Sequence, residues 1–298
     1  MIRVQVLHPA FLLQSPSPKY MRCGLTCPQA RLAASRARCA GRRLIPSPSV
    51  GIRSLKQPTL RKQIQVFSSA QDADQIQELR DRSLVLPSFS DGELEKAVME
   101  VKAIMGPSAD KIDEETLTWY VRMRKLDVDE TVPRLTRYQD WRESGYEGIE
   151  EEQVATELAT GKAFLCDDCD LLGRPVVVVD ASKQVVYDRD LEASKQLCVH
   201  LMDSALLRMQ GTGSETLLSI WDLRGFGTRN ADISFLKFFV DCMFKYYPKR
   251  IGQVLLVEPP FVFQPVWQVI KPLLGKYSSI VRFVKVSEIE YYMGKQIF

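Results

Sequence analysis

After Gly161 the sequence alternates short apolar runs with stretches of helical spacing, and this alternation limits the chain to few architectures. The clearest run is Pro175–Asp180 (PVVVVD), a continuous apolar segment typical of a strand covered on both faces. Strands separated by helices of about 10 to 15 residues predict an α/β fold, with a mainly parallel sheet and helices on its faces. The further strands are expected at 163–166, 216–223, 253–257 and 280–286, and the helices at 192–209, 232–247 and 261–274.

Residues 89–150 have helical spacing and no predicted strand, so they indicate an N-terminal helical lobe. Ser90, Asp113 and Asp127 can each cap the start of a helix in this segment. Three short amphipathic helices cannot bury a large core alone. We therefore expect the lobe to pack against the sheet domain, residues 151–298.

The first 70 residues differ in charge from the rest of the chain. Of the 40 Lys and Arg, 12 lie in residues 1–70, whereas all 37 Asp and Glu follow, which leaves residues 71–298 with a net charge of −9. An acidic mature region argues against a nucleic-acid binder that neutralises phosphates. The acid-free, Arg- and Ser-rich start is typical of a disordered transit peptide that is removed on import.

The length and Ser/Pro content of residues 1–70 favour a chloroplast (plastid) address, with the mitochondrion as the alternative. A basic arm that stays on the protein is the other interpretation. Residues 71–88 are polar and end in a short apolar run at Leu84, which predicts a linker with a hydrophobic tether.

Two of the predicted helices carry more apolar surface than one face of a sheet can cover. In 232–247, Phe235 and Phe239 extend the apolar stripe around the helix, and Phe261 does so in 261–274. A helix that is apolar on most of its circumference is either deeply buried or faces a ligand cavity or a membrane. The pattern leaves core packing and a cavity both open.

The residues give little support for an enzyme, a cofactor or a metal site. His200 lies among apolar residues, where a satisfied, half-buried imidazole is commoner than a catalytic one. The glycines near Asn230 fail the dinucleotide-binding pattern because Asn230 occupies the third glycine position. Cys166 and Cys169 have the spacing of a redox pair but no second pair for zinc, so a surface loop or a reversible disulfide are the alternatives.

Several short segments, in order along the chain, resemble the CRAL-TRIO lipid-binding family. Gly173–Pro175 (GRP) before a Val strand resembles the family's turn, and Asp222–Gly225 (DLRG) closes a strand in a similar way. The most specific likeness is Tyr247–Arg250 (YPKR), which leads through a strand to Glu258–Phe263 (EPPFVF). Val121–Val128 (VRMRKLDV) resembles the family's basic segment in the helical lobe.

The resemblance implies a sheet and helices that enclose an apolar lipid cavity, with 261–274 as a mobile gate helix and 232–247 as a wall. It implies a monomer without catalytic activity that binds a lipid or small lipophile and transfers or presents it at a peripheral organelle membrane surface. A protein-docking or regulatory module with a collapsed cavity on the same fold is the alternative. The residues expected to bind the lipid are Ser219, Trp221, Phe235, Phe239, Met243, Phe261, Phe263, Val266, Trp267, Ile270 and Leu274.

The head-group positions of the family's phosphatidylinositol-transfer members are only partly present. The resemblance places Lys125, Ser278 and Arg282 at or beside these positions. Lys249, however, stands where those members have a Glu. The likeness therefore implies weak phosphatidylinositol selectivity, and a phospholipid and a prenyl-type lipophile both stay open.

Overall fold

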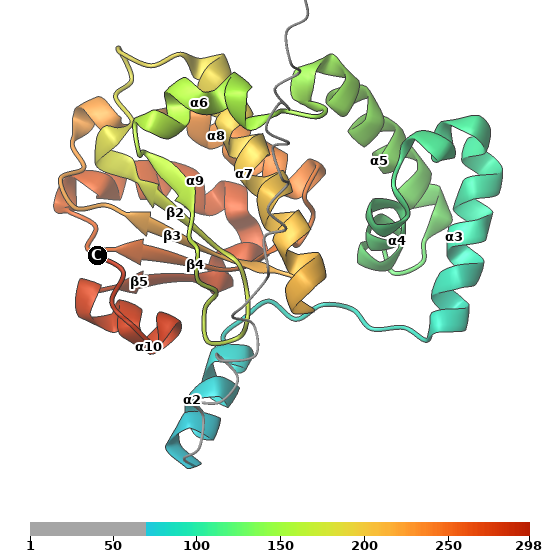
Figure 1. Ribbon diagram of the computed structural model, residues 1–298, viewed down its shortest axis with the longest axis horizontal. Coiled ribbons are helices and arrows are strands. Elements are labelled where there is room, and N and C mark those ends of the chain that lie inside the picture. The colour runs from blue at the N-terminus through green and yellow to red at the C-terminus, as the bar shows by residue number, and fades with distance from the viewer. Residues whose placement is uncertain (1–69) are drawn as a thin grey trace, which may run out of the picture. The chain divides into compact units, whose positions relative to one another are not determined.

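A five-stranded sheet forms the centre of the computed structural model, which describes residues 70–298 (Figure 1). Residues 1–69 of the predicted transit peptide lie outside the described residues. The strands are β1 (Ala163–Leu165), β2 (Val176–Asp180), β3 (Leu217–Asp222), β4 (Ile251–Val257) and β5 (Val281–Val284), in the order β1-β2-β3-β4-β5. β2 to β5 are parallel and β1 is antiparallel to β2, so the predicted α/β class with a mainly parallel sheet is confirmed.

Three helices connect the parallel strands: α7 (Leu191–Thr212), α8 (Ile233–Lys245) and α9 (Gln264–Leu274). Asp190 and Asp232 cap α7 and α8, since each carboxylate accepts hydrogen bonds from backbone amides of the first turn. The predicted helix 261–274 begins instead with a 3-10 turn, Phe261–Phe263. Pro265 then lies in the first turn of α9, where its missing amide hydrogen costs nothing.

Both faces of the sheet are covered. Along β3, Leu218 and Ile220 pack with Ile289 of α10 (Ile289–Met293), while Leu217 belongs to the opposite face, against α7 and α8. This alternation follows from the two-residue period of a strand. Figure 1 shows α10 beside β5, at the end of the chain.

The segment expected to be a linker, 71–88, is in part helical, which corrects that expectation. It contains α2 (Ala70–Asp81), whose Leu79 is fully buried in the core beneath the sheet. The Leu84 amide donates to the Gly252 carbonyl at 2.9 Å, and Arg174 donates to the Ser83 hydroxyl at 2.9 Å. The polarity of α2 concealed its role, because its contacts are one buried leucine and polar bonds from Gln75 and Glu78 to Tyr291.

The helical lobe consists of α3 (Asp91–Met105), α4 (Glu114–Met123) and α5 (Val128–Trp141). Ser90, Asp113 and Asp127 cap these helices as predicted. After the lobe, α6 (Glu151–Ala159) leads to β1. No helix among residues 70–298 is both long and apolar enough to cross a membrane.

The lobe packs against the turn between α8 and β4. The Trp119 indole donates to the Pro248 carbonyl at 2.8 Å, and the Tyr120 hydroxyl donates to the Lys245 carbonyl at 2.9 Å. The Arg250 guanidinium lies over the Trp119 ring, 3.6 Å from its centroid. All described residues belong to one compact unit.

Candidate functional site: an apolar cavity between the sheet and three helices

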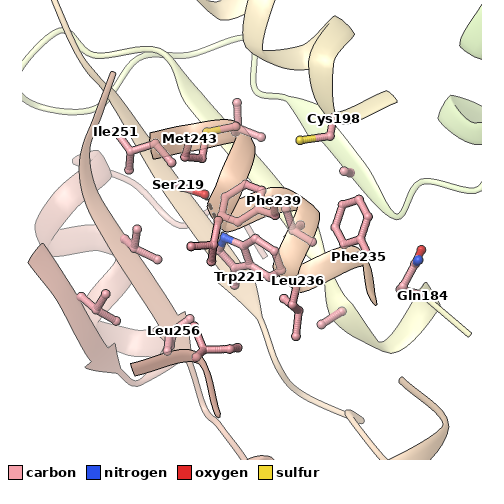
Figure 2. Close-up of a pocket in the computed structure, with 18 of the residues that line it drawn as sticks. Gln184, Cys198, Ser219, Trp221, Phe235, Leu236, Phe239, Met243, Ile251 and Leu256 are labelled. Atoms are coloured by element: carbon pink, nitrogen blue, oxygen red, sulfur yellow. Dashed lines mark hydrogen bonds between the residues drawn. The ribbon is translucent and has the colours of Figure 1, made fainter. Parts of the chain in front are cut away.

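A cavity lies between one face of the sheet and helices α7, α8 and α9, and most of its lining is apolar (Figure 2). The space that the centre of a water molecule can reach measures about 190 Å³. The whole unfilled space, including solvent at the mouth, measures about 1720 Å³. The smaller volume leaves out the space directly beside the walls, which ligand atoms also fill. The volume available to a ligand therefore lies between these two values.

The floor of the cavity comes from the strands. Ser219 and Trp221 alternate with the residues on the far face of β3 and therefore point into the cavity. The Trp221 indole donates to the Ser219 hydroxyl at 2.9 Å, which satisfies its N–H inside an apolar environment. Neighbouring strands add Val177, Val254 and Leu256.

One wall is formed by the inner face of α8. Phe235, Phe239 and Met243 line the cavity, four residues apart, so they lie on one side of the helix. The Phe239 ring packs edge-on against Trp221 with centroids 5.1 Å apart. Figure 2 shows these side chains from α8 facing Ser219 and Trp221 of β3.

α9 and the turn before it close the cavity. Phe263, Trp267, Ile270 and Leu274 line it, as the sequence predicts. Phe261 does not, because its side chain is 91% exposed and faces solvent. Val266 is buried and packs in the core with Phe263, outside the cavity lining.

A few polar side chains belong to the cavity lining. In Figure 2, Gln184 and Ile251 lie on opposite sides of the view. On the Gln184 side, the Gln184 amide donates to Asp232 at 3.0 Å, and Asp232 is also paired with Arg189. Lys162, elsewhere in the lining, is paired with Glu157. These charges are compensated within the protein and help to hold the walls together.

Cys198 of α7 brings a thiol into the lining. Burial, assisted by the charge of Asp203, raises the pKa of Cys198 to about 12. The thiol is therefore neutral at physiological pH and contributes to the cavity as a small apolar group.

The three predicted head-group residues lie outside the cavity lining. Lys125 is exposed in the turn after α4, Ser278 follows α9, and Arg282 on β5 donates to the Ser279 carbonyl at 2.7 Å. Their role at a head group stays a prediction. The lining instead contains Lys249 and Tyr277, whose polar ends a sequence pattern alone did not place there.

The other motifs have structural roles. The His200 imidazole is paired with the Ile149 carbonyl at 2.8 Å through Nδ1. The Asn230 side chain accepts from the Gly227 amide and donates to two carbonyls of the neighbouring loop. Cys166 and Cys169 are free thiols, and burial raises the pKa of Cys169, so it lacks the activation of a reactive thiol.

Fold and site together define an α/β protein whose sheet and helices enclose an apolar cavity. Residues 158–297 match the model of the CRAL/TRIO domain. A CRAL-TRIO domain-containing protein of Saccharomyces cerevisiae is 25% identical over 232 residues, 69% of this chain and 74% of the relative. The matched segment contains all five strands and the three helices, α7, α8 and α9, that enclose the cavity.

Two further proteins are similar to this chain. A phosphatidylinositol transfer protein of Eremothecium gossypii is 24% identical over 188 residues, 58% of this chain but only 43% of the relative. The crystal structure of Sfh5 superposes with a TM-score of 0.54 at 14% identity, over 69% of this chain and 85% of that one, which shows a shared fold.

Proposed function

We propose that this protein binds a lipid or a small lipophile in the cavity and transfers or presents it at a membrane. The observation that carries the proposal is the enclosed apolar lining, supplied by the sheet, α8 and α9. Each methylene group kept out of water contributes about 0.8 kcal/mol, so such a cavity favours hydrocarbon. The phosphatidylinositol transfer protein among the relatives supports the same kind of activity.

Binding and release need no covalent step, and we propose a non-catalytic role. The charged groups Lys162 and Asp232 in the lining are engaged in salt bridges. They are therefore poorly placed to exchange protons with a ligand.

The outer face of α9 supports a role at a membrane surface. Phe261 is 91% exposed, Val269 46% and Leu273 47%, whereas Trp267 and Ile270 of the same segment face the cavity. A helix that is apolar on both sides can rest on lipid while its inner side contacts the ligand. We propose α9 as the gate through which the ligand exchanges.

The composition of residues 1–70 supports a plastid membrane as the site of action, with the mitochondrion as the alternative. Incubation of the radiolabelled full chain with isolated chloroplasts and with mitochondria distinguishes these. Import is shown by a shortened protein that is protected from added protease. If neither organelle yields such a protein, the plastid and the mitochondrial proposals are both contradicted.

Mass spectrometry of the purified full chain tests the proposal. We expect a lipid or lipophile to co-purify, or to be taken up from vesicles. Cys198→Trp places a bulky ring in the cavity and is expected to lower the bound amount. Leu207→Trp is the matched control, because Leu207 lies on the same helix and is 68% exposed. A wild-type protein that carries and extracts nothing would contradict the proposal.

A docking module with a collapsed cavity is the second candidate. The observation in its favour is the small space of about 190 Å³ open to water centres, below the roughly 300–1,000 Å³ of common ligand pockets. A reproducible protein partner, combined with no uptake of lipid, would support it over lipid binding.

A further inference from the structure

A hydrogen-bonded network of six side chains surrounds the first turn of α7 and reaches the cavity. We call it the polar network, and its members are Glu157, Lys162, Gln184, Arg189, Ser194 and Asp232. Four of the six belong to the lining of the cavity, most of which is apolar. A polar group shielded from water needs a partner in the protein or in a ligand. The atoms that the network leaves without a partner therefore indicate what the ligand must offer.

Lys162 has one N–H group more than its partners require. Its amine donates to the Ser194 hydroxyl at 2.8 Å and is paired with Glu157. Lys162 is only 7% exposed and Ser194 2%, and both residues line the cavity. An ammonium group has three N–H donors, and residues 70–298 provide acceptors for two of them. The third is available to a ligand.

Gln184 is held in place through both its side chain and its main chain. Its Nε2 donates to Asp232 at 3.0 Å, and the Asn230 side chain donates to the Gln184 main-chain carbonyl at 2.9 Å. The bond to Asp232 orients the carboxamide, because a carboxylate accepts only from the nitrogen. Within the described part of the chain, the amide oxygen has no donor and the second N–H has no acceptor. The Gln184 carboxamide thus offers a ligand one acceptor and one donor.

Two consecutive residues before α7 connect the two halves of the polar network. The Arg189 guanidinium donates at 2.9 Å to Asp232, which also holds Gln184. The main-chain carbonyl of the following residue accepts from the Ser194 hydroxyl at 2.7 Å, and this hydroxyl holds Lys162. Continuous contacts around the first turn of α7 therefore fix both residues that have atoms to spare.

The polar network carries no net charge. Lys162 is neutralised by Glu157, and Arg189 is neutralised by Asp232. The carboxylate of Asp190, which caps α7, adds a negative charge nearby. An anionic head group would lose its hydration here without meeting an uncompensated cation of the network. The network therefore favours a neutral group.

A hydroxyl group is the neutral group that uses both free atoms of the Gln184 carboxamide. Its O–H donates to the amide oxygen, and its oxygen accepts from the second N–H or from Lys162. A ketone or an ester only accepts, so it leaves the amide oxygen without a donor. A hydrocarbon end satisfies neither atom, and the polar groups of the wall would then stay unpaired.

We propose that the polar network binds the hydroxyl group of a neutral lipophile whose hydrocarbon fills the apolar cavity, with Gln184 as its main partner. From Gln184 the hydrocarbon extends past Phe235 toward Trp221 (Figure 2). This inference rests on the proposed function and specifies its ligand, a lipophilic alcohol rather than a phospholipid.

Competitive uptake from vesicles tests the inference with three probes that share one branched hydrocarbon skeleton. Phosphatidylcholine vesicles carry equal amounts of phytane, phytanol and phytanic acid at mildly alkaline pH, where the acid is ionised. The lipids bound by the full chain are quantified by gas chromatography and mass spectrometry. We expect phytanol to be preferred over both other probes by about two- to tenfold, the worth of one neutral hydrogen bond.

Gln184→Met removes the carboxamide and keeps the length of the side chain. Uptake of phytanol should fall to the level of phytane, while continued uptake of phytane shows that the cavity is intact. Gln210→Met is the matched control and should retain the preference. Gln210 also donates to a carboxylate, that of Glu115 at 2.9 Å, but it is exposed on α7 and outside the cavity lining.

Several outcomes would overturn the inference and leave the proposed function intact. They are equal uptake of phytanol and phytane by the wild type, preferred uptake of phytanic acid, and uptake of phosphatidylcholine alone. An unchanged ratio of phytanol to phytane in Gln184→Met would overturn it as well. Uptake of no lipid at all would contradict the proposed function and this inference with it.

Discussion

At the scale of single residues, Asp232 joins three elements. Its carboxylate accepts from the Phe235 amide at the start of α8, from Gln184 in the cavity lining and from Arg189 before α7. Burial alone raises the pKa of Asp232, but these hydrogen bonds outweigh it and leave the pKa below its ordinary value of 3.8. One carboxylate thus fixes the helix that forms the cavity wall.

The lowered pKa of Asp232 predicts acid sensitivity. Because the folded protein favours the charged form, its contribution is present above about pH 4 and is lost as the pH falls through the folded-state pKa. Asp232→Asn should lower the free energy of unfolding by roughly 1–3 kcal/mol at neutral pH and flatten this acid dependence.

Urea unfolding between pH 3 and pH 7 measures both effects. Asp241→Asn on the exposed side of α8 is the control, because its pair with Lys245 is solvent-exposed and contributes little. An unchanged pH profile in Asp232→Asn would contradict the assigned role.

At the scale of elements, α9 has an apolar side toward the cavity and another toward solvent. This explains why its sequence holds more apolar residues than one core contact requires. The 3-10 turn before it separates the two sides: Phe263 points inward and Phe261 outward, although they are two residues apart.

Leu273→Asp is expected to weaken binding to lipid vesicles by about tenfold to a hundredfold, because a leucine inserted into lipid contributes roughly 1.5–3 kcal/mol. Leu273 is 47% exposed, so the free energy of unfolding should change by less than about 0.5 kcal/mol. Vesicle co-sedimentation measures the first quantity and urea unfolding the second.

Gln268→Asp, also at an exposed position of α9, is the matched control and should bind vesicles nearly as the wild type does. Equal binding by Leu273→Asp and the wild type would show that this face does not contact the membrane.

At the scale of the whole molecule, the helical lobe and the sheet share their stability. The lobe buries a core of its own around Leu117 and Leu135, but Trp119 and Tyr120 reach into the turn that carries Lys249. A small lobe cannot bury enough surface to fold firmly by itself.

Trp119→Ala should therefore lower the stability of the entire described unit by about 3–5 kcal/mol, through a single transition. Far-ultraviolet circular dichroism and tryptophan fluorescence should report the same midpoint. Tyr187→Ala, at a position 78% exposed, should leave that midpoint unchanged. A lobe transition separate from that of the sheet would contradict the shared unit.

Much of the fold was predictable because its signals are local. The Val run of β2, the capping residues Ser90, Asp113 and Asp127, and the order of strands and helices are all properties of short segments. α2 was missed because one buried leucine in a polar helix gives no periodic signal.

The cavity was predictable only in part. The resemblance implied that Phe235, Phe239 and Met243 of α8 bind the ligand, and all three line the cavity. Phe261 and Val266 were expected there as well. Phe261 lies in the 3-10 turn, whose angular step differs from that of an α-helix, and its side chain faces solvent. Val266 lies in α9 but is buried in the core beside Phe263.

The sequence by itself determined the alternation of elements, their caps and the excess of apolar residues on α8 and α9, because these depend on neighbouring residues. Only the tertiary structure decided which apolar side chains face the cavity. It also decided that Lys249 and Tyr277 belong to the cavity lining. Lys249 and Tyr277 come from separate segments, the turn before β4 and the segment after α9, and only the packing of these segments around the sheet brings both to one cavity.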